Sequence, residues 1–226
     1  MRPIAIIFIG PPGSGKSTQA GELVKHFGIL EHFDLGHVIE KTLYDPQNQD
    51  SPKIQEEKQR FEKGELVSSD WVMGLEKEHI TRIAGAGKGI IFSGSPRERE
   101  EAEFLIPLLE ETYGGGSILV FHIVVGEAVS LFRNTRRRVC ENCGTVVIWS
   151  KDTEDDAFCP VCGGKLVRRS LDTVEATQRR LREYEYKAEA ILSFFVAVGL
   201  PIFQINGERM PEEIAGEIAS IVKQHI

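Results

Sequence analysis

Nine residues near the start of the chain have the types and spacing of a phosphate-binding loop. Residues 10–18, GPPGSGKST, fit the pattern GxxxxGK[ST], in which small residues let backbone N–H groups surround phosphate oxygens. Lys16 is placed to reach the β- and γ-phosphates of a nucleotide, and the Ser17 hydroxyl to bind Mg²⁺. An apolar run precedes the loop and a helix-period pattern follows it. The alternative is a Gly/Pro-rich turn between a strand and a helix that binds nothing.

Four cysteines form a second group with metal-ligand spacing. Cys140 and Cys143 make one CxxC pair, Cys159 and Cys162 make another, and fifteen residues separate the two pairs. Four thiolates at this spacing can close a tetrahedral Zn²⁺ site. Because the protein fills all four ligand positions, we expect a structural and not a catalytic ion. The alternatives are two disulfides, four unligated thiols, or iron in place of zinc.

Arginines on both sides of the cysteine segment suggest a phosphate clamp. Arg133 and Arg137 lie four residues apart and so share one helix face, and Arg169 and Arg180 follow the cysteines. Forked guanidinium hydrogen bonds suit phosphoryl oxygens. The alternative for each arginine is a solvated charge on a helix.

Apolar runs and helical patterns alternate along the 226 residues. We predict strands at residues 4–9, 29–33, 89–92, 118–125 and 201–205, which gives an α/β fold with a parallel sheet covered by helices on both faces. Helices are predicted at 38–44, 53–63 and 70–84, and Asp172 with Glu175 fits a capping box for a long later helix. His122, in the fourth strand, is expected to be packed or hydrogen-bonded and not a ligand.

Composition narrows the class of protein. The net charge of −7 argues against general nucleic-acid binding, because such domains are normally basic. Arg136 to Arg138, beside the cysteines, are the feature that favours RNA. No apolar run is long enough to span a bilayer, and the N-terminus is unlike a signal peptide. We expect a monomer in the cytoplasm or another reducing compartment, with no membrane partner.

Landmarks along nearly the whole chain resemble the adenylate kinase family in its form with a zinc-bearing lid. They are the phosphate loop, SGSPR at 93–97, FRNTRRR at 132–138, the four cysteines, RRSLD at 168–172 with EATQRRL at 175–181, and the Asn206-Gly207 turn. The resemblance implies a P-loop NTPase fold with a five-stranded parallel sheet. It also implies a kinase core at residues 1–33, 68–138 and 168–226, a helical NMP-binding insertion at 34–67 and a zinc-ribbon lid at 139–167.

The same resemblance implies an activity and roles for individual residues. Family members transfer the γ-phosphoryl group of ATP reversibly to a nucleoside monophosphate, with Mg²⁺. The implied ATP-binding residues are Gly13, Ser14, Gly15, Lys16, Ser17, Thr18 and Arg133, which would also stack on the donor adenine. The implied catalytic residues are Lys16, Arg97, Arg137, Arg169 and Arg180. The implied acceptor residues are Leu35, Gly36, Glu40, Lys41, Val67, Gly94, Arg97 and Glu101.

The acceptor side departs from the family pattern. Where the family has TGD[ML]xR, residues 35–40 are LGHVIE, so that Leu35 replaces a threonine and Glu40 an arginine, for which Lys41 could substitute. The DGFPR turn is SGSPR, and Ser93 replaces the acidic residue that helps to organise Mg²⁺. A glutamine that contacts the acceptor adenine is replaced near Glu100 or Glu101.

Three functions are compatible with these residues. The leading hypothesis is a nucleoside monophosphate kinase, with AMP or a different nucleotide as acceptor, since a carboxylate can accept from the amino group of guanine or cytosine. The first alternative is a nucleotide-binding protein with little kinase activity, which acts as a sensor or partner-binding module. The second is a zinc-ribbon protein that associates with RNA.

Overall fold

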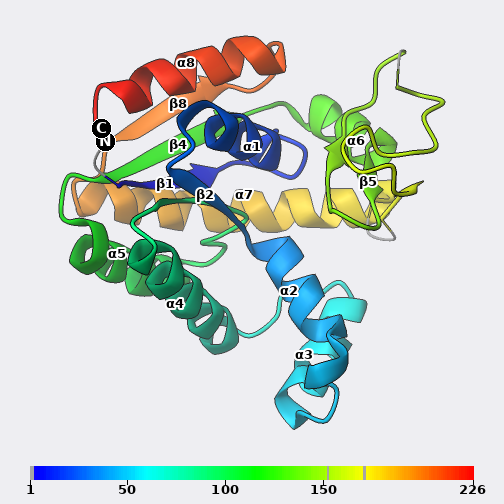
Figure 1. The fold of residues 1–226 in the computed structure, drawn as a ribbon, viewed down its shortest axis with the longest axis horizontal. Coiled ribbons are helices and arrows are strands. Elements are labelled where there is room, and N and C mark those ends of the chain that lie inside the picture. The colour runs from blue at the N-terminus through cyan, green and yellow to red at the C-terminus, as the bar shows by residue number, and fades with distance from the viewer. Residues whose placement is uncertain (1–2, 152, 170–171) are drawn as a thin grey trace.

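A parallel five-stranded sheet forms the centre of the structure (Figure 1). The computed structural model describes residues 3–151, 153–169 and 172–226. The strands, in spatial order β2-β3-β1-β4-β8, are β1 (Ala5–Ile9), β2 (Leu30–Asp34), β3 (Gly89–Ser93), β4 (Ile118–Val124) and β8 (Ile202–Asn206). All four neighbouring pairs are parallel, so the carboxyl ends of the strands meet at one edge. The predicted α/β class and the five-stranded sheet are confirmed.

Helices cover both faces of the sheet (Figure 1). One face carries α1 (Lys16–Phe27) and α8 (Pro211–Lys223), and the other carries α4 (Ser69–Gly85), α5 (Arg99–Tyr113) and α7 (Val174–Ala197). Successive strand residues point to opposite faces, so Phe8 packs under α1 and α8 while Ile7 packs under α4 and α5. Within the described part of the chain, no helix has both the length and the apolarity needed to cross a membrane.

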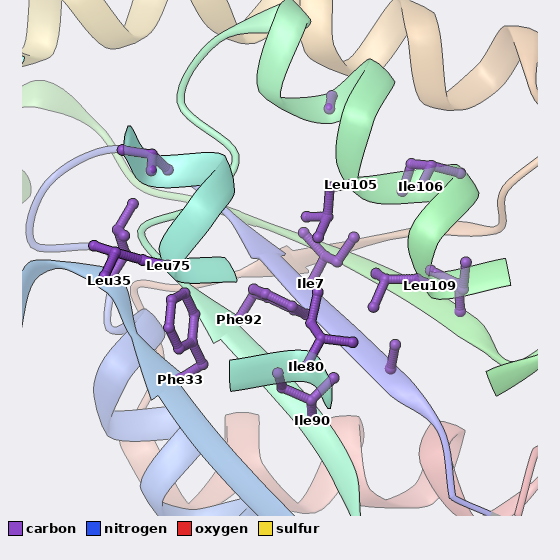
Figure 2. Close-up of a cluster of buried hydrophobic side chains, with 14 of the residues drawn as sticks. Ile7, Phe33, Leu35, Leu75, Ile80, Ile90, Phe92, Leu105, Ile106 and Leu109 are labelled. Atoms are coloured by element: carbon purple, nitrogen blue, oxygen red, sulfur yellow. The ribbon is translucent and has the colours of Figure 1, made fainter. Parts of the chain in front are cut away.

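The apolar cluster under α4 and α5 fixes the edge of the sheet near β2. Figure 2 shows Phe33 and Phe92 in the same cluster as Ile7 and Leu105. The rings of Phe33 and Phe92 meet edge to face, with centroids 5.4 Å apart. Leu35, the first residue after β2, is fully buried there as well. The carboxyl end of β2 is therefore anchored on both sides of Asp34.

Two segments extend beyond the strand ends, on the same side of the molecule (Figure 1). The first contains α2 (Leu35–Tyr44), a 3₁₀ turn at Pro46–Asn48 and α3 (Pro52–Glu62). The second follows α6 (Glu127–Arg136) and holds a small antiparallel sheet of β5 (Arg138–Cys140), β6 (Val146–Val147) and β7 (Leu166–Val167). Apart from Arg138, the first residue of β5, these elements fall inside the ranges predicted for the insertion and the lid, whose boundaries as domains stay a prediction.

Two helix starts differ from the sequence-based prediction. The helix predicted from residue 38 begins at Leu35, because the Asp34 carboxylate caps it by accepting from the His37 amide at 3.2 Å. The long helix begins at Val174 with Thr173 as its N-cap, whose hydroxyl accepts from the Ala176 amide. The predicted capping box of Asp172 with Glu175 is therefore wrong.

Candidate active site

The phosphate loop joins β1 to α1 at the carboxyl edge of the sheet. Gly13 and Gly15 have φ angles of 74° and 100°, in the left-handed region that favours glycine. A Cβ on Gly13 would also lie 2.5 Å from Nδ2 of Asn134, so the loop packs closely against α6. Helix α1 begins at Lys16, and its free N-terminal amides therefore face the loop, where they can bind an anion.

Lys16 lies at the centre of a group of cations. Its Nζ donates to the carbonyl oxygens of Gly10 and Pro11, both at 2.8 Å. Burial and the charges of Arg180, Arg97 and Arg137 together lower the pKa of Lys16 to about 7. Three arginines distant in sequence are thus close enough to act on one lysine. A polyphosphate bound between them would relieve their repulsion.

Asp172 orients two of these arginines. Arg137 donates from Nε and Nη2 to the two carboxylate oxygens of Asp172, each at 2.7 Å, and Nη1 of Arg180 lies 3.6 Å from Oδ1. The carboxylate is nearly inaccessible to solvent, which strengthens these interactions. Arg137 follows α6 and Arg180 is on α7, so one buried acid aligns arginines from both sides of the cysteine segment.

The other predicted arginines lie around the same edge. Nη1 of Arg133 donates to the Gly207 carbonyl at 2.8 Å, between the phosphate loop and the turn after β8. Nε of Arg97 donates to the Gly94 carbonyl at 2.7 Å. The charge of Arg169 contributes to lowering the pKa values of both Asp34 and Arg180. All five predicted arginines therefore belong to one region.

The predicted acceptor residues divide into two groups. Gly36 and Gly94 lie beside the Arg97 guanidinium, since a Cβ on either would be within 4 Å of Nη2. Glu101 is 2% exposed, and its Oε2 accepts from the Arg97 amide at 2.6 Å. Leu35 and Val67 are buried in the hydrophobic core, whereas Glu40 and Lys41 are exposed on α2.

Sequence reasoning missed two acidic residues at this site. Asp34, the last residue of β2, accepts from the Ser17 hydroxyl at 2.8 Å. Its position at the carboxyl end of a strand was the available signal. Glu76 on α4 is fully buried and accepts from the Ser95 hydroxyl. A glutamate on the apolar face of the predicted helix was the available signal there.

The four cysteines converge as predicted. Their sulfur atoms all lie within 4.8 Å of one another, and none is in a disulfide. The Cys140–Cys162 and Cys143–Cys159 sulfur pairs are 3.4 and 3.7 Å apart. Four thiolates about 2.3 Å from a tetrahedral Zn²⁺ would be about 3.8 Å from each other. The donor set therefore fits one such ion.

The arginines that favoured RNA binding make contacts within the chain. Arg136 stacks on Phe132, with its guanidinium carbon 4.2 Å from the ring centroid, and also lies near Trp149. Arg137 is paired with Asp172. Arg138 donates to the carbonyl oxygens of Thr153 and Asp156. Arg136 thus joins α6 to the cysteine segment, Arg138 makes contacts within that segment, and Arg137 joins the two parts of the chain that flank it. His122 is hydrogen-bonded to the Tyr184 hydroxyl at 3.0 Å, as predicted.

Comparisons with known proteins agree with this geometry. The family model described as adenylate kinase matches residues 8–200. An adenylate kinase of Archaeoglobus fulgidus is 31% identical over 97% of this chain and 98% of its own length. Another adenylate kinase, from Carboxydothermus hydrogenoformans, is 33% identical over 97% of this chain and 99% of its own length. A third, from Staphylococcus epidermidis, is 32% identical over 96% of this chain and 98% of its own length.

The cation cluster predicts the effect of removing Arg180. We expect Arg180→Ala and Arg137→Ala to lower kcat for phosphoryl transfer by about 10²–10³-fold, because charge contacts to a transferring phosphoryl group contribute that much. Steady-state kinetics on the purified variants measure this. Arg179→Ala is the matched control, since this neighbouring side chain is exposed and should be nearly silent. Wild-type turnover in Arg137→Ala and Arg180→Ala would show that the cluster is not catalytic.

The pKa of Lys16 predicts that nucleotide binding takes up a proton. Above a pKa of about 7 the free lysine is mostly neutral, and bound phosphates restore its charge by raising that pKa. ATP binding near pH 8 should therefore take up as much as about one proton, and the uptake should decline toward pH 6. Calorimetry in buffers of different ionisation enthalpy measures it. Proton release near pH 8, or an equal uptake by Lys16→Met, would contradict this assignment.

The cysteine cluster predicts that metal stabilises the protein. We expect one metal ion per chain by elemental analysis, which also distinguishes zinc from iron. Chelation should lower the thermal midpoint by more than about 2 °C, the shift that roughly 1 kcal/mol causes in a protein of this size, and added Zn²⁺ should restore it. Cys143→Ser should behave like the chelated protein. A metal-free protein that is insensitive to chelators would exclude the site.

Proposed function

Because the chain belongs to the adenylate kinase family of ATP-dependent nucleoside monophosphate kinases, we propose that it transfers the γ-phosphoryl group of ATP reversibly to a nucleoside monophosphate. The observation that carries the proposal is the mutual proximity of Lys16, Arg97, Arg137 and Arg180. Such a site does little covalent chemistry. It aligns donor and acceptor and neutralises charge that spreads over the transferring group.

In this proposal the two substrates bind to different elements of the fold. The ATP phosphates bind along residues 13–18 with Mg²⁺ at Ser17, and the donor adenine stacks on Arg133. Arg97, between Gly36 and Gly94, holds the acceptor phosphate. Arg137, Arg169 and Arg180 neutralise the transferring group. The zinc-bearing lid, which we infer from the four cysteines, covers the phosphates and excludes water. A lid contact supports this, since a Cβ on Gly144 would lie 3.2 Å from the His37 ring on α2.

We further propose that the acceptor base presents hydrogen-bond donors, as guanine and cytosine do. Glu101 lies near the position at which the family uses glutamine for adenine, and a carboxylate only accepts hydrogen bonds. A second buried acid, Glu76, supports a polar edge on the acceptor base more generally, because its Oε2 is buried without a hydrogen-bond partner among the described residues. Burial and the Glu101 charge together raise the pKa of Glu76 to about 8, so near neutral pH its side chain is mostly protonated and can donate a hydrogen bond as well as accept one. A base with polar edges can satisfy buried groups of this kind.

One observation favours a second candidate, a nucleotide-binding protein with little kinase activity. Ser93 stands where the family has the acid that organises Mg²⁺, and its uncharged hydroxyl lies 2.6 Å from Nε2 of His32 and 3.3 Å from Oγ of Ser17. Such a protein would bind ATP in a calorimeter and form no product. The RNA-associated alternative has lost its support, because Arg136 to Arg138 are used within the chain.

A panel of acceptors tests the proposal. Coupled assays with AMP, CMP, GMP, UMP and the deoxynucleotides should give kcat/KM for GMP or CMP at least about a hundredfold above that for AMP, because unpaired polar groups reject the wrong base. Glu101→Gln should shift the preference toward AMP. Glu100→Gln is the matched control, because the Glu100 side chain is next to Glu101 in the sequence and is exposed.

The outcomes separate the candidates. A preference for AMP would refute the proposed acceptor and leave the kinase intact. ATP binding without turnover of any acceptor would refute the kinase and support the binding protein. RNA binding that weakens with salt would revive the third hypothesis.

A further inference from the structure

We propose that Asp34 supplies the carboxylate that orients the Mg²⁺ of bound ATP, in place of an acid at Ser93 on the neighbouring strand. The inference rests on the proposed function, since it concerns the metal of the ATP complex. It explains how the site keeps a negative charge near the metal although Ser93 replaces the acidic residue that the family has at the end of β3. The evidence is the arrangement of four side chains at the carboxyl ends of β2 and β3.

The two positions are neighbours in the sheet. Asp34 and Ser93 are register partners in the parallel pairing of β2 with β3, and each is the last residue of its strand. A carboxylate moved from one to the other stays at the same edge and shifts by one strand spacing, about 4.8 Å. Such a shift is within the reach of a hydrated Mg²⁺, which often contacts carboxylates through its own waters.

The Ser17 hydroxyl links the two positions. It donates to Oδ2 of Asp34 at 2.8 Å and lies 3.3 Å from Oγ of Ser93. Ser17 is the residue of the phosphate loop that binds Mg²⁺ with its hydroxyl. A hydroxyl and a carboxylate are the hard oxygen ligands that this ion prefers, so the residues present fit the ion.

Two hydrogen bonds at Asp34 suit its ionised form. The Ser17 hydroxyl donates to Oδ2 at 2.8 Å and the His37 amide donates to Oδ1 at 3.2 Å, and donors to both oxygens favour the carboxylate. Asp34 is also the acid whose charge raises the pKa of Lys16, and so it acts within the cation cluster. The negative charge expected near the metal is therefore present, and it comes from β2.

The position of the lost acid is filled by a neutral pair. Nε2 of His32, also on β2, lies 2.6 Å from Oγ of Ser93. Burial lowers the pKa of His32, which favours the neutral ring. An acid at residue 93 would meet both this imidazole and the Asp34 carboxylate. The serine avoids a second buried negative charge beside the first.

A purely structural role is the competing explanation, because Asp34 also caps α2. Serine is as good an N-cap as aspartate, so Asp34→Ser removes the carboxylate and keeps the cap. Restoring the acid on the other strand, in Asp34→Ser with Ser93→Asp, tests whether the charge or the position matters. Asp45→Ser is the matched control, since Asp45 caps the 3₁₀ turn in the same way.

The measurement needs no acceptor and no turnover. Mn²⁺ binding to each variant with a non-hydrolysable ATP analogue is followed by electron paramagnetic resonance, and metal-free binding of the analogue by calorimetry. We expect Asp34→Ser to weaken Mn²⁺ binding in this complex by about ten- to a hundredfold, the usual effect of losing a supporting group around a metal. Metal-free binding should stay close to wild type. The double variant should regain most of the loss, and Asp45→Ser should match wild type.

Three results would overturn the proposal. They are unchanged Mn²⁺ binding in Asp34→Ser, an equal loss of metal-free binding, and a double variant that regains nothing. Failure of the proposed function looks different. The wild-type protein would then transfer no phosphoryl group to any nucleotide, while the metal-binding differences among the variants persisted.

Discussion

The site depends on holding several cations close together although their charges repel one another. Burial and neighbouring arginines depress the pKa of Lys16, and Arg180 is affected in the same way. The fold opposes this repulsion with two acids, Asp172 at the base of the lid and Asp34 at the end of β2. A cluster of cations without a bound anion costs free energy. It must therefore be held in place, before a polyphosphate binds, by the sheet, by the chain segments on either side of the cysteines and by both acids.

Much of this arrangement follows from local patterns in the sequence. The phosphate loop, the two CxxC pairs and the five apolar runs each carry their own spacing, and they predicted the loop, the sulfur cluster and the sheet. Arg137 and Arg180 could be proposed because helical periodicity placed them near the core. The signal for each of these features lies in residues that are close along the chain.

The rest depends on contacts that no local pattern contains. The sequence around Asp172 fits a capping box, but in the structure its carboxylate accepts two hydrogen bonds from Arg137 instead. The proximity of Asp34 to Ser93 follows from the lateral pairing of β2 with β3, between residues far apart in the chain. The contact of Glu76 with Ser95 exists only because α4 packs above the turn that contains Ser95. Tertiary pairing, and not propensity, decided each of these roles.

The ion pair between Arg137 and Asp172 has a mechanical consequence. It joins the chain where it leaves the core for the lid to the chain where it returns, and so closes that excursion into a loop. Closing a loop removes conformational freedom that the metal would otherwise have to remove alone. The ion pair therefore fixes the two ends of this excursion, whereas a metal ion held by the four cysteines would order the residues between them. We expect removal of such an ion to disturb the residues around the cysteines first and to leave Arg137 paired with Asp172.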